Sequence, residues 1–241
     1  MSLAPRWFTL SPVVLKPVVG VGIGELFQAG FLIVTALVLN NLAAAYGDGP
    51  LAAMGVAVRI AQVPEFLVMG LTLGVLPLLA YSYGKGDGHR LASALRASAI
   101  TVGSITLVTA ATLIVFSEQV ISAFSADRSV LAIGTTILAA QLVAMVANGF
   151  AGLLTSLFQA TGQGLAATLM SLTQGALFIP VVVLGDHWFG LTGIIWALTV
   201  TEGSVLLAGV VLWLAFRPAI NRGLKDGSTE PTEGLLGPAG A

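Results

Sequence analysis

The sequence predicts an all-α, polytopic membrane protein with six transmembrane helices, and three observations support this fold class. Hydrophobic residues make up 56% of the 241 residues and charged residues only 9%, and the mean hydropathy is +0.97. A soluble domain would carry about a quarter charged residues. The apolar residues are gathered in six long segments, and the basic residues between them fall mostly on one side. Together these features indicate a multi-pass protein with a definite orientation.

Each apolar segment is long enough to cross a bilayer as a helix. About 20 apolar residues span the roughly 30 Å of hydrocarbon, and only a helix satisfies its backbone polar groups within one segment. The predicted spans are residues 18–45, 51–81, 91–116, 130–158, 165–184 and 191–216. They form one transmembrane domain, 18–216. A cytoplasmic segment, 1–17, precedes it, and the polar tail, 217–241, is predicted to be disordered and cytoplasmic.

The connections between the spans are short and rich in turn-forming residues. Residues 46–50 (YGDGP), 161–164 (TGQG) and 185–190 (GDHWFG) are tight turns, and Trp188 in the last of them is suited to anchoring a helix at the interface. Residues 84–90 form a glycine-rich loop. The longest connection, 117–129, is expected to contain an amphipathic turn through Val120, Ile121 and Phe124.

The basic residues set the orientation. With the amino terminus inside, eight Lys and Arg residues fall on the cytoplasmic side and two, Arg59 and Arg128, fall outside. This bias follows the positive-inside rule. We therefore expect a protein of the cell (inner or plasma) membrane with both termini cytoplasmic.

Composition and spacing exclude several classes of function. The net charge of −1 offers no basic face for nucleic acid. The chain has no cysteine, and its two histidines, His89 and His187, lie in different loops without ligand spacing, so we expect no metal site and no cofactor. No pair of catalytic groups can be assembled for an enzyme.

Several motifs appear in a characteristic order along the chain. They include Gly55 to Arg59-Ile60, then Gly70-x-x-x-Gly74 with Pro77, then the run FQATGQ at 158–163, and finally Gly190-Leu191-x-Gly193-x-x-Trp196. In this order and spacing the chain, from about residue 16 to 217, resembles the second six-helix lobe of the multidrug and toxic compound extrusion (MATE) family. The family's transporters have two such lobes, whereas only one is present here.

The resemblance implies a function. It predicts a cation-coupled antiporter lobe that exports organic, cationic or amphipathic solutes by alternating access, with H⁺ or Na⁺ as the coupling ion. Lobes of this kind are related by an axis along the membrane normal, so a parallel homodimer or a separate partner lobe would rebuild the transporter. Two alternatives stay open: an inactive fragment of a larger transporter, and a flippase for lipid-linked precursors from a related superfamily.

Two intramembrane acids are the candidates for binding the coupling ion, because ionisable groups in hydrocarbon usually face a cavity or a partner. Glu202 lies near the middle of the sixth span and matches a position that is often acidic in the family. Glu25 follows a glycine-rich stretch in the first span, with Gln28 on the same face. The alternative for either acid is a protonated carboxyl group bonded to a neighbouring helix.

Other polar residues could line a cavity or join helices. Arg59, Gln62 and Glu65 step by three along the second span and suggest a buried network, in which Arg59 could instead reach the interface. Further candidates for lining a cavity or joining a polar network are Asn40, Asn148, Gln174 and Thr199. Pro64, Pro77 and Pro180 are expected to kink their helices and to assist gating, because proline removes one backbone hydrogen bond.

Overall fold

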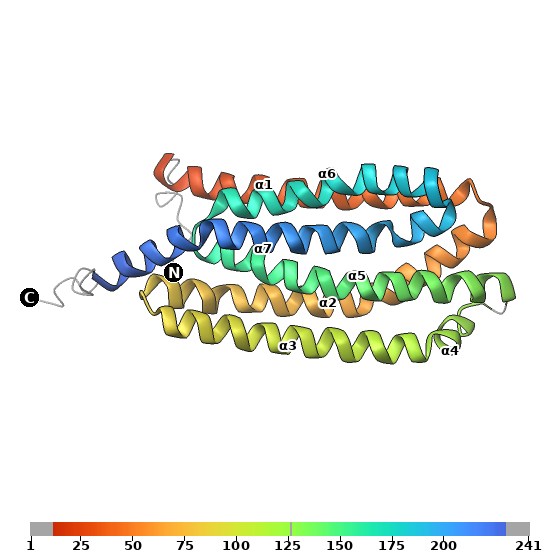
Figure 1. Ribbon diagram of the computed structural model, residues 1–241, viewed down its shortest axis with the longest axis horizontal. Helices are drawn as coiled ribbons and strands as arrows, with labels where there is room; N and C mark the ends of the chain where they lie inside the picture. Colours follow the sequence, from red (N-terminus) through yellow and green to blue (C-terminus); the bar gives the residue numbers. More distant parts are fainter. Residues whose placement is uncertain (1–11, 126, 230–241) are drawn as a thin grey trace, which may run out of the picture.

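The computed structural model describes residues 12–125 and 127–229, which form seven helices without any β-strand in those ranges. The helices are α1 (Pro12–Ala44), α2 (Asp48–Gly84), α3 (Gly88–Val115), α4 (Ser117–Ser122), α5 (Arg128–Ala160), α6 (Gly164–Phe189) and α7 (Leu191–Thr229). Figure 1 shows six long helices lying side by side, with the short α4 at one end of the bundle.

The bundle is built to cross a membrane. Five helices, α2, α3, α5, α6 and α7, are long and apolar enough to span it, and α1 contributes a shorter apolar stretch, Ala29–Ala44. The long helices run in alternating directions, so α1 begins and α7 ends at the same end of the bundle (Figure 1). The prediction of an all-α polytopic fold with six apolar helices is therefore confirmed. Which side of the membrane each end faces stays a prediction.

The last helix corrects the predicted domain boundaries. α7 continues beyond residue 216 to Thr229, so residues 217–229 are helical and the prediction of a disordered tail was wrong for them. Ile220, which is 5% exposed, packs with Leu79, Leu91 and Leu157, and Leu224 lies against the same cluster. Their i, i+4 spacing gives the extension an apolar face that holds it on the bundle. Residues 1–11 and 230–241 lie outside the described residues.

The connection between α3 and α5 contains the expected amphipathic turn. α4 forms there, and Ile121 is fully buried while Phe124 is 63% exposed. Ile121 Cδ1 lies so close to α5 that a methyl group at Gly134 would be 3.2 Å from it. The helix thus covers one end of the core with Ile121, and Val120 packs against the same cluster.

α5 is the central helix of the bundle. It packs against α2, α3, α4, α6 and α7. Small residues allow this. A methyl group at Gly149 would lie 2.9 Å from Val102 of α3 and 3.2 Å from Val68 of α2. Ser156 also donates a hydrogen bond of 3.1 Å to the carbonyl oxygen of Thr72 on α2. Close approach replaces the hydrophobic effect as the source of helix association in lipid.

α6 connects α1 to α7 by two close contacts. The ring of Phe31 on α1 occupies the space that a side chain at Gly175 would need. At the opposite end from the α7 extension, Gly185 of α6 meets Gly193 of α7 backbone to backbone. The tight turn between them uses Gly190 with φ of +58°, a conformation that favours glycine.

One polar contact joins two turns at this same end of the bundle. The hydroxyl group of Tyr46, in the turn between α1 and α2, donates a hydrogen bond of 2.6 Å to Asp186 Oδ1 of α6. This bond, followed by desolvation and the negative charge of Asp186, raises the pKa of Tyr46 above its usual value of 10.0. The contact fixes the α1–α2 turn against the α6–α7 turn.

We expect Gly193→Ala to destabilise the protein. The added methyl group would collide with the carbonyl oxygen of Gly185, and backbone cannot move aside as a side chain can, so the loss should be about 1–3 kcal/mol. Thermal unfolding in detergent measures it. Gly203→Ala on the same helix is the matched control, since nothing lies within 4 Å of its added atom. Equal unfolding temperatures for the two variants would contradict the close contact.

We also expect Tyr46→Phe to change the dependence of stability on pH. Because the pKa of Tyr46 is raised in the folded state, its contribution is complete below pH of about 10 and is lost as the pH rises through the folded value. The wild-type unfolding temperature should therefore fall more steeply above that pH than the unfolding temperature of Tyr46→Phe. Parallel curves from pH 8 to 11 would show that the hydrogen bond does not form.

Candidate functional site

A buried carboxyl group lies at the junction of three helices. Glu202 is 3% exposed, and its Oε1 accepts a hydrogen bond of 2.6 Å from Nε2 of Gln174 on α6. Glu202 comes eleven residues after the start of α7, or about 17 Å along the helix, which places it near the middle of a bilayer of about 30 Å. Glu202 is therefore buried at the depth in its helix that the sequence indicates.

The second oxygen of this carboxyl group has no partner. Oε2 of Glu202 is buried and accepts no hydrogen bond from any described residue. The amide of Asn148, on α5, interacts with the same carboxyl group, yet its side chain is exposed and leaves Oε2 unsatisfied. An unsatisfied buried carboxylate oxygen is costly, and binding a proton or a small cation would remove that cost.

A second carboxyl group lies within electrostatic range of Glu202. Glu65 of α2 is partly buried, and the charges of Glu65 and Glu202 interact. Two carboxyl groups that interact in a medium of low dielectric constant repel when both are ionised. The sequence did not reveal this pair, because no periodicity relates residues on α2 and α7.

Thr199 forms a hydrogen bond between two helices. Its hydroxyl group donates a hydrogen bond of 2.8 Å to the carbonyl oxygen of Ala140, so it joins α7 to α5 one turn before Glu202. Thr201 likewise donates to Ala197 within its own helix. The hydroxyl protons near Glu202 are thus used by backbone carbonyl groups.

The network predicted for α2 does not form as a buried unit. Arg59 and Gln62 are exposed, and no hydrogen bond or ion pair joins them to Glu65 in the described part of the chain. Residues three apart on an α-helix are offset by about 60° around its axis, so positions 59 to 65 fan over about 120°. Arg59 and Gln62 therefore fall on the open face of α2, and Glu65 falls nearer to the core.

The remaining predicted residues lie in three settings. Asn40, near the end of α1, is exposed. Pro64 is buried inside α2, Pro77 is exposed on the same helix and Pro180 is exposed on α6, and their role in kinking stays a prediction. Glu25 and Gln28 belong to α1, but their side chains lie outside the described residues. Among the side chains that are described, no three His, Asp or Glu residues gather as a metal site.

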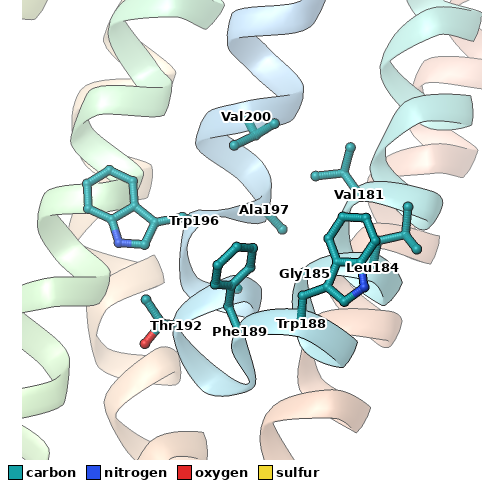
Figure 2. Close-up of a pocket in the computed structure, with 10 residues that line it drawn as sticks. Val181, Leu184, Gly185, Trp188, Phe189, Thr192, Trp196, Ala197 and Val200 are labelled. Carbon is teal, nitrogen blue, oxygen red and sulfur yellow. The ribbon is translucent and has the colours of Figure 1, made fainter.

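An apolar groove of about 430 Å³ lies between α6 and α7, beside the turn that joins them. In Figure 2, Phe189 at the end of α6 lies in the middle of the groove lining. Trp188 and Leu184 of α6 lie to one side of it, and Trp196 of α7 lies to the other. Its lining includes no titratable side chain. The groove can therefore hold an aliphatic or aromatic group.

The comparisons with known proteins agree on one family. The MatE family model matches residues 22–184 of the chain. The chain belongs to the MatE family. It is 34% identical over 198 residues to the multidrug export protein MepA of Staphylococcus aureus (strain NCTC 8325 / PS 47), which covers 82% of this chain and 44% of MepA. It is 35% identical over 196 residues to MepA of Staphylococcus saprophyticus, covering 78% and 43%. The chain thus spans less than half the length of these curated relatives.

Solved MATE structures share the fold. A MATE protein in the bent conformation has a TM-score of 0.81 at 20% identity, covering 95% of this chain and 51% of that one. The Vibrio cholerae MATE transporter VcmN in the bent form gives 0.77 at 20%, covering 91% and 50%. The MOP superfamily transporter of Pyrococcus furiosus gives 0.79 at 19%, covering 93% and 50%. The predicted resemblance to one half-length lobe of this family is therefore confirmed.

We expect Gln174→Leu to destabilise this MatE lobe by about 1–3 kcal/mol. The substitution removes the donor to Oε1 of Glu202 and leaves a buried polar group unsatisfied. Thermal unfolding in detergent tests this, with Gln62→Leu as the control for loss of an exposed amide. The double variant Gln174→Leu/Glu202→Leu should recover most of the loss, because both partners are then apolar. No difference between Gln174→Leu and Gln62→Leu would contradict the bond.

Proposed function

We propose that this chain is one lobe of a cation-coupled exporter of organic, cationic or amphipathic solutes, and that Glu202 binds the coupling ion. The observation that carries the proposal is the buried, unsatisfied Oε2 of Glu202 in the middle of a membrane helix. Membership of the MatE family and similarity to multidrug export proteins support the transport of such solutes.

In the proposed mechanism H⁺ or Na⁺ binds to the carboxyl group of Glu202. Binding removes the repulsion between Glu202 and Glu65 and satisfies Oε2, so it favours closer packing of α2 on α7. Release of the ion favours their separation. An ion shifts such an equilibrium only by its different affinity for the two states, and a pair of carboxyl groups shared between two helices supplies that difference.

The polar surface of the lobe favours a second lobe. Arg59 and Gln62 on α2 and Asn148 on α5 are exposed, although both helices are apolar enough to span a membrane. Lipid would solvate such groups poorly. A parallel second copy, or a separate partner lobe, would enclose these polar groups in a cavity between the two lobes and allow alternating access.

The coupling role is tested by flux in proteoliposomes. The native mass of the purified chain in nanodiscs is measured first, to identify a dimer. Export of a cationic dye is then measured under an imposed pH gradient or Na⁺ gradient. Glu202→Gln should abolish the dependence of flux on the gradient, because an amide cannot exchange a proton and carries no charge. Its unfolding temperature should stay close to that of the wild type.

Glu118→Gln on the exposed surface of α4 is the matched control and should keep gradient-driven flux. Unchanged coupling in Glu202→Gln would refute the assignment of this residue. A wild-type dimer without dye flux under either gradient would refute the exporter, and would favour an inactive fragment of a larger transporter. Movement of a polyprenyl-linked precursor in place of the dye would identify a flippase.

A further inference from the structure

Two cations converge on one aromatic ring at the end of the bundle that carries the α2–α3 turn. Lys85 Nζ lies 4.9 Å from the centre of the Tyr81 ring, and Arg90 Cζ lies 5.3 Å from the same centre. Tyr81 is 50% exposed. The ring attracts each cation, but the two cations repel each other, so an anion that binds between them would stabilise the arrangement.

The α7 extension brings more positive charge to this end. Gly223 packs against the hydroxyl group of Tyr83, and a methyl group at Gly88 would lie 3.5 Å from Leu224 Cδ1. The extension therefore lies directly against the α2–α3 turn, as Figure 1 also shows. It carries the basic residues Arg217, Arg222 and Lys225, all exposed. We call these three residues, with Lys85 and Arg90, the basic end.

Two acidic residues, Asp87 and Asp226, lie along the chain near the five residues of the basic end. Asp87 lies in the turn, and its carboxyl group accepts a hydrogen bond of 2.8 Å from the backbone N–H of Arg90, which caps α3. The opposite end of the bundle has the reverse balance. Asp48, Glu118, Asp127 and Asp186 are found there with the cation Arg128, while Arg59 lies further along α2. The charged residues are therefore mainly basic at one end of the lobe and mainly acidic at the other.

An exposed apolar stripe leads along α2 into the basic end. Gly74, Leu78, Tyr81 and Lys85 recur at i, i+4, i+7 and i+11, which is one face of a helix. Nothing lies within 4 Å of an added methyl group at Gly74, and Leu78 is 42% exposed. The face thus passes from apolar to aromatic to cationic over about 17 Å. This order matches an acyl chain, an interface and a phosphate group.

We propose that the stripe from Gly74 to Lys85, with Arg90, binds an anionic phospholipid whose phosphate group lies between Lys85 and Arg90. The ammonium and guanidinium groups bind the phosphate, the Tyr81 ring holds both cations in place and marks the interface, and Leu78 contacts the acyl chain. The extension of α7 adds positive charge beside the headgroup. This lipid site is distinct from the proposed ion site at Glu202 and does not depend on it.

The site is tested on the full chain in detergent by titrating phosphatidylglycerol and following the unfolding temperature. A lipid that binds the folded state raises that temperature. Each basic residue near an anionic headgroup contributes about 1 kcal/mol, so Lys85→Gln/Arg90→Gln should need roughly 30-fold more lipid for the same shift. Tyr81→Leu keeps both charges and should weaken binding several-fold, because it frees the two cations.

Arg128→Gln, which removes one cation at the opposite end, is the matched control and should respond like the wild type. The proposal is overturned if the double variant responds to phosphatidylglycerol as the wild type does, or if phosphatidylcholine is equally effective. Sodium phosphate at matched ionic strength should have no effect. An equal shift from phosphate alone would show an inorganic anion site and would refute the role of the apolar stripe.

Discussion

Every polar group within hydrocarbon must find its partner inside the protein, and this constraint accounts for most of the structure. It requires helices for all six apolar segments, and it directs hydroxyl groups back to their own helices, as Thr106 and Thr161 show by donating to the carbonyl groups of Val102 and Leu157. The same constraint makes one exception informative. Oε2 of Glu202 is buried without a described hydrogen-bond donor, so the fold holds a group that an ion or a proton would satisfy.

The packing of α5 places this exception where it can act. Its small residues let α2 and α3 approach closely, and Thr199 ties α7 to the backbone of Ala140. Glu202 therefore has a rigid neighbour in α5 and a specific donor, Gln174, in α6. Glu65 lies on α2, whose other side is open.

The fold followed from the sequence because it depends on local properties. Segment length, composition and turn residues define the helices, and the motifs from Gly55 to Trp196 indicated the family. The helical extension to Thr229 was missed, since Pro218 and the polar residues after it indicate a helix end until the contact of Ile220 with Leu79 and Leu91 is known. The depth of Glu202 in its span could be read from the sequence. Its hydrogen bond with Gln174 could not, because such a bond depends on how two helices face one another.

Polar side chains are exposed on two long apolar helices of this lobe. Arg59, Gln62 and Asn148 lie on helices that are apolar enough to span a membrane, where lipid solvates polar groups poorly. Arg59 and Gln62 lie on α2, which also carries Glu65, and Asn148 lies on α5, the central helix of the bundle. A second lobe placed there would share its cavity with the carboxyl pair, so solute and ion would bind on either side of α2. Binding of the solute could then affect binding of the ion directly, because only one helix would separate the two proposed sites.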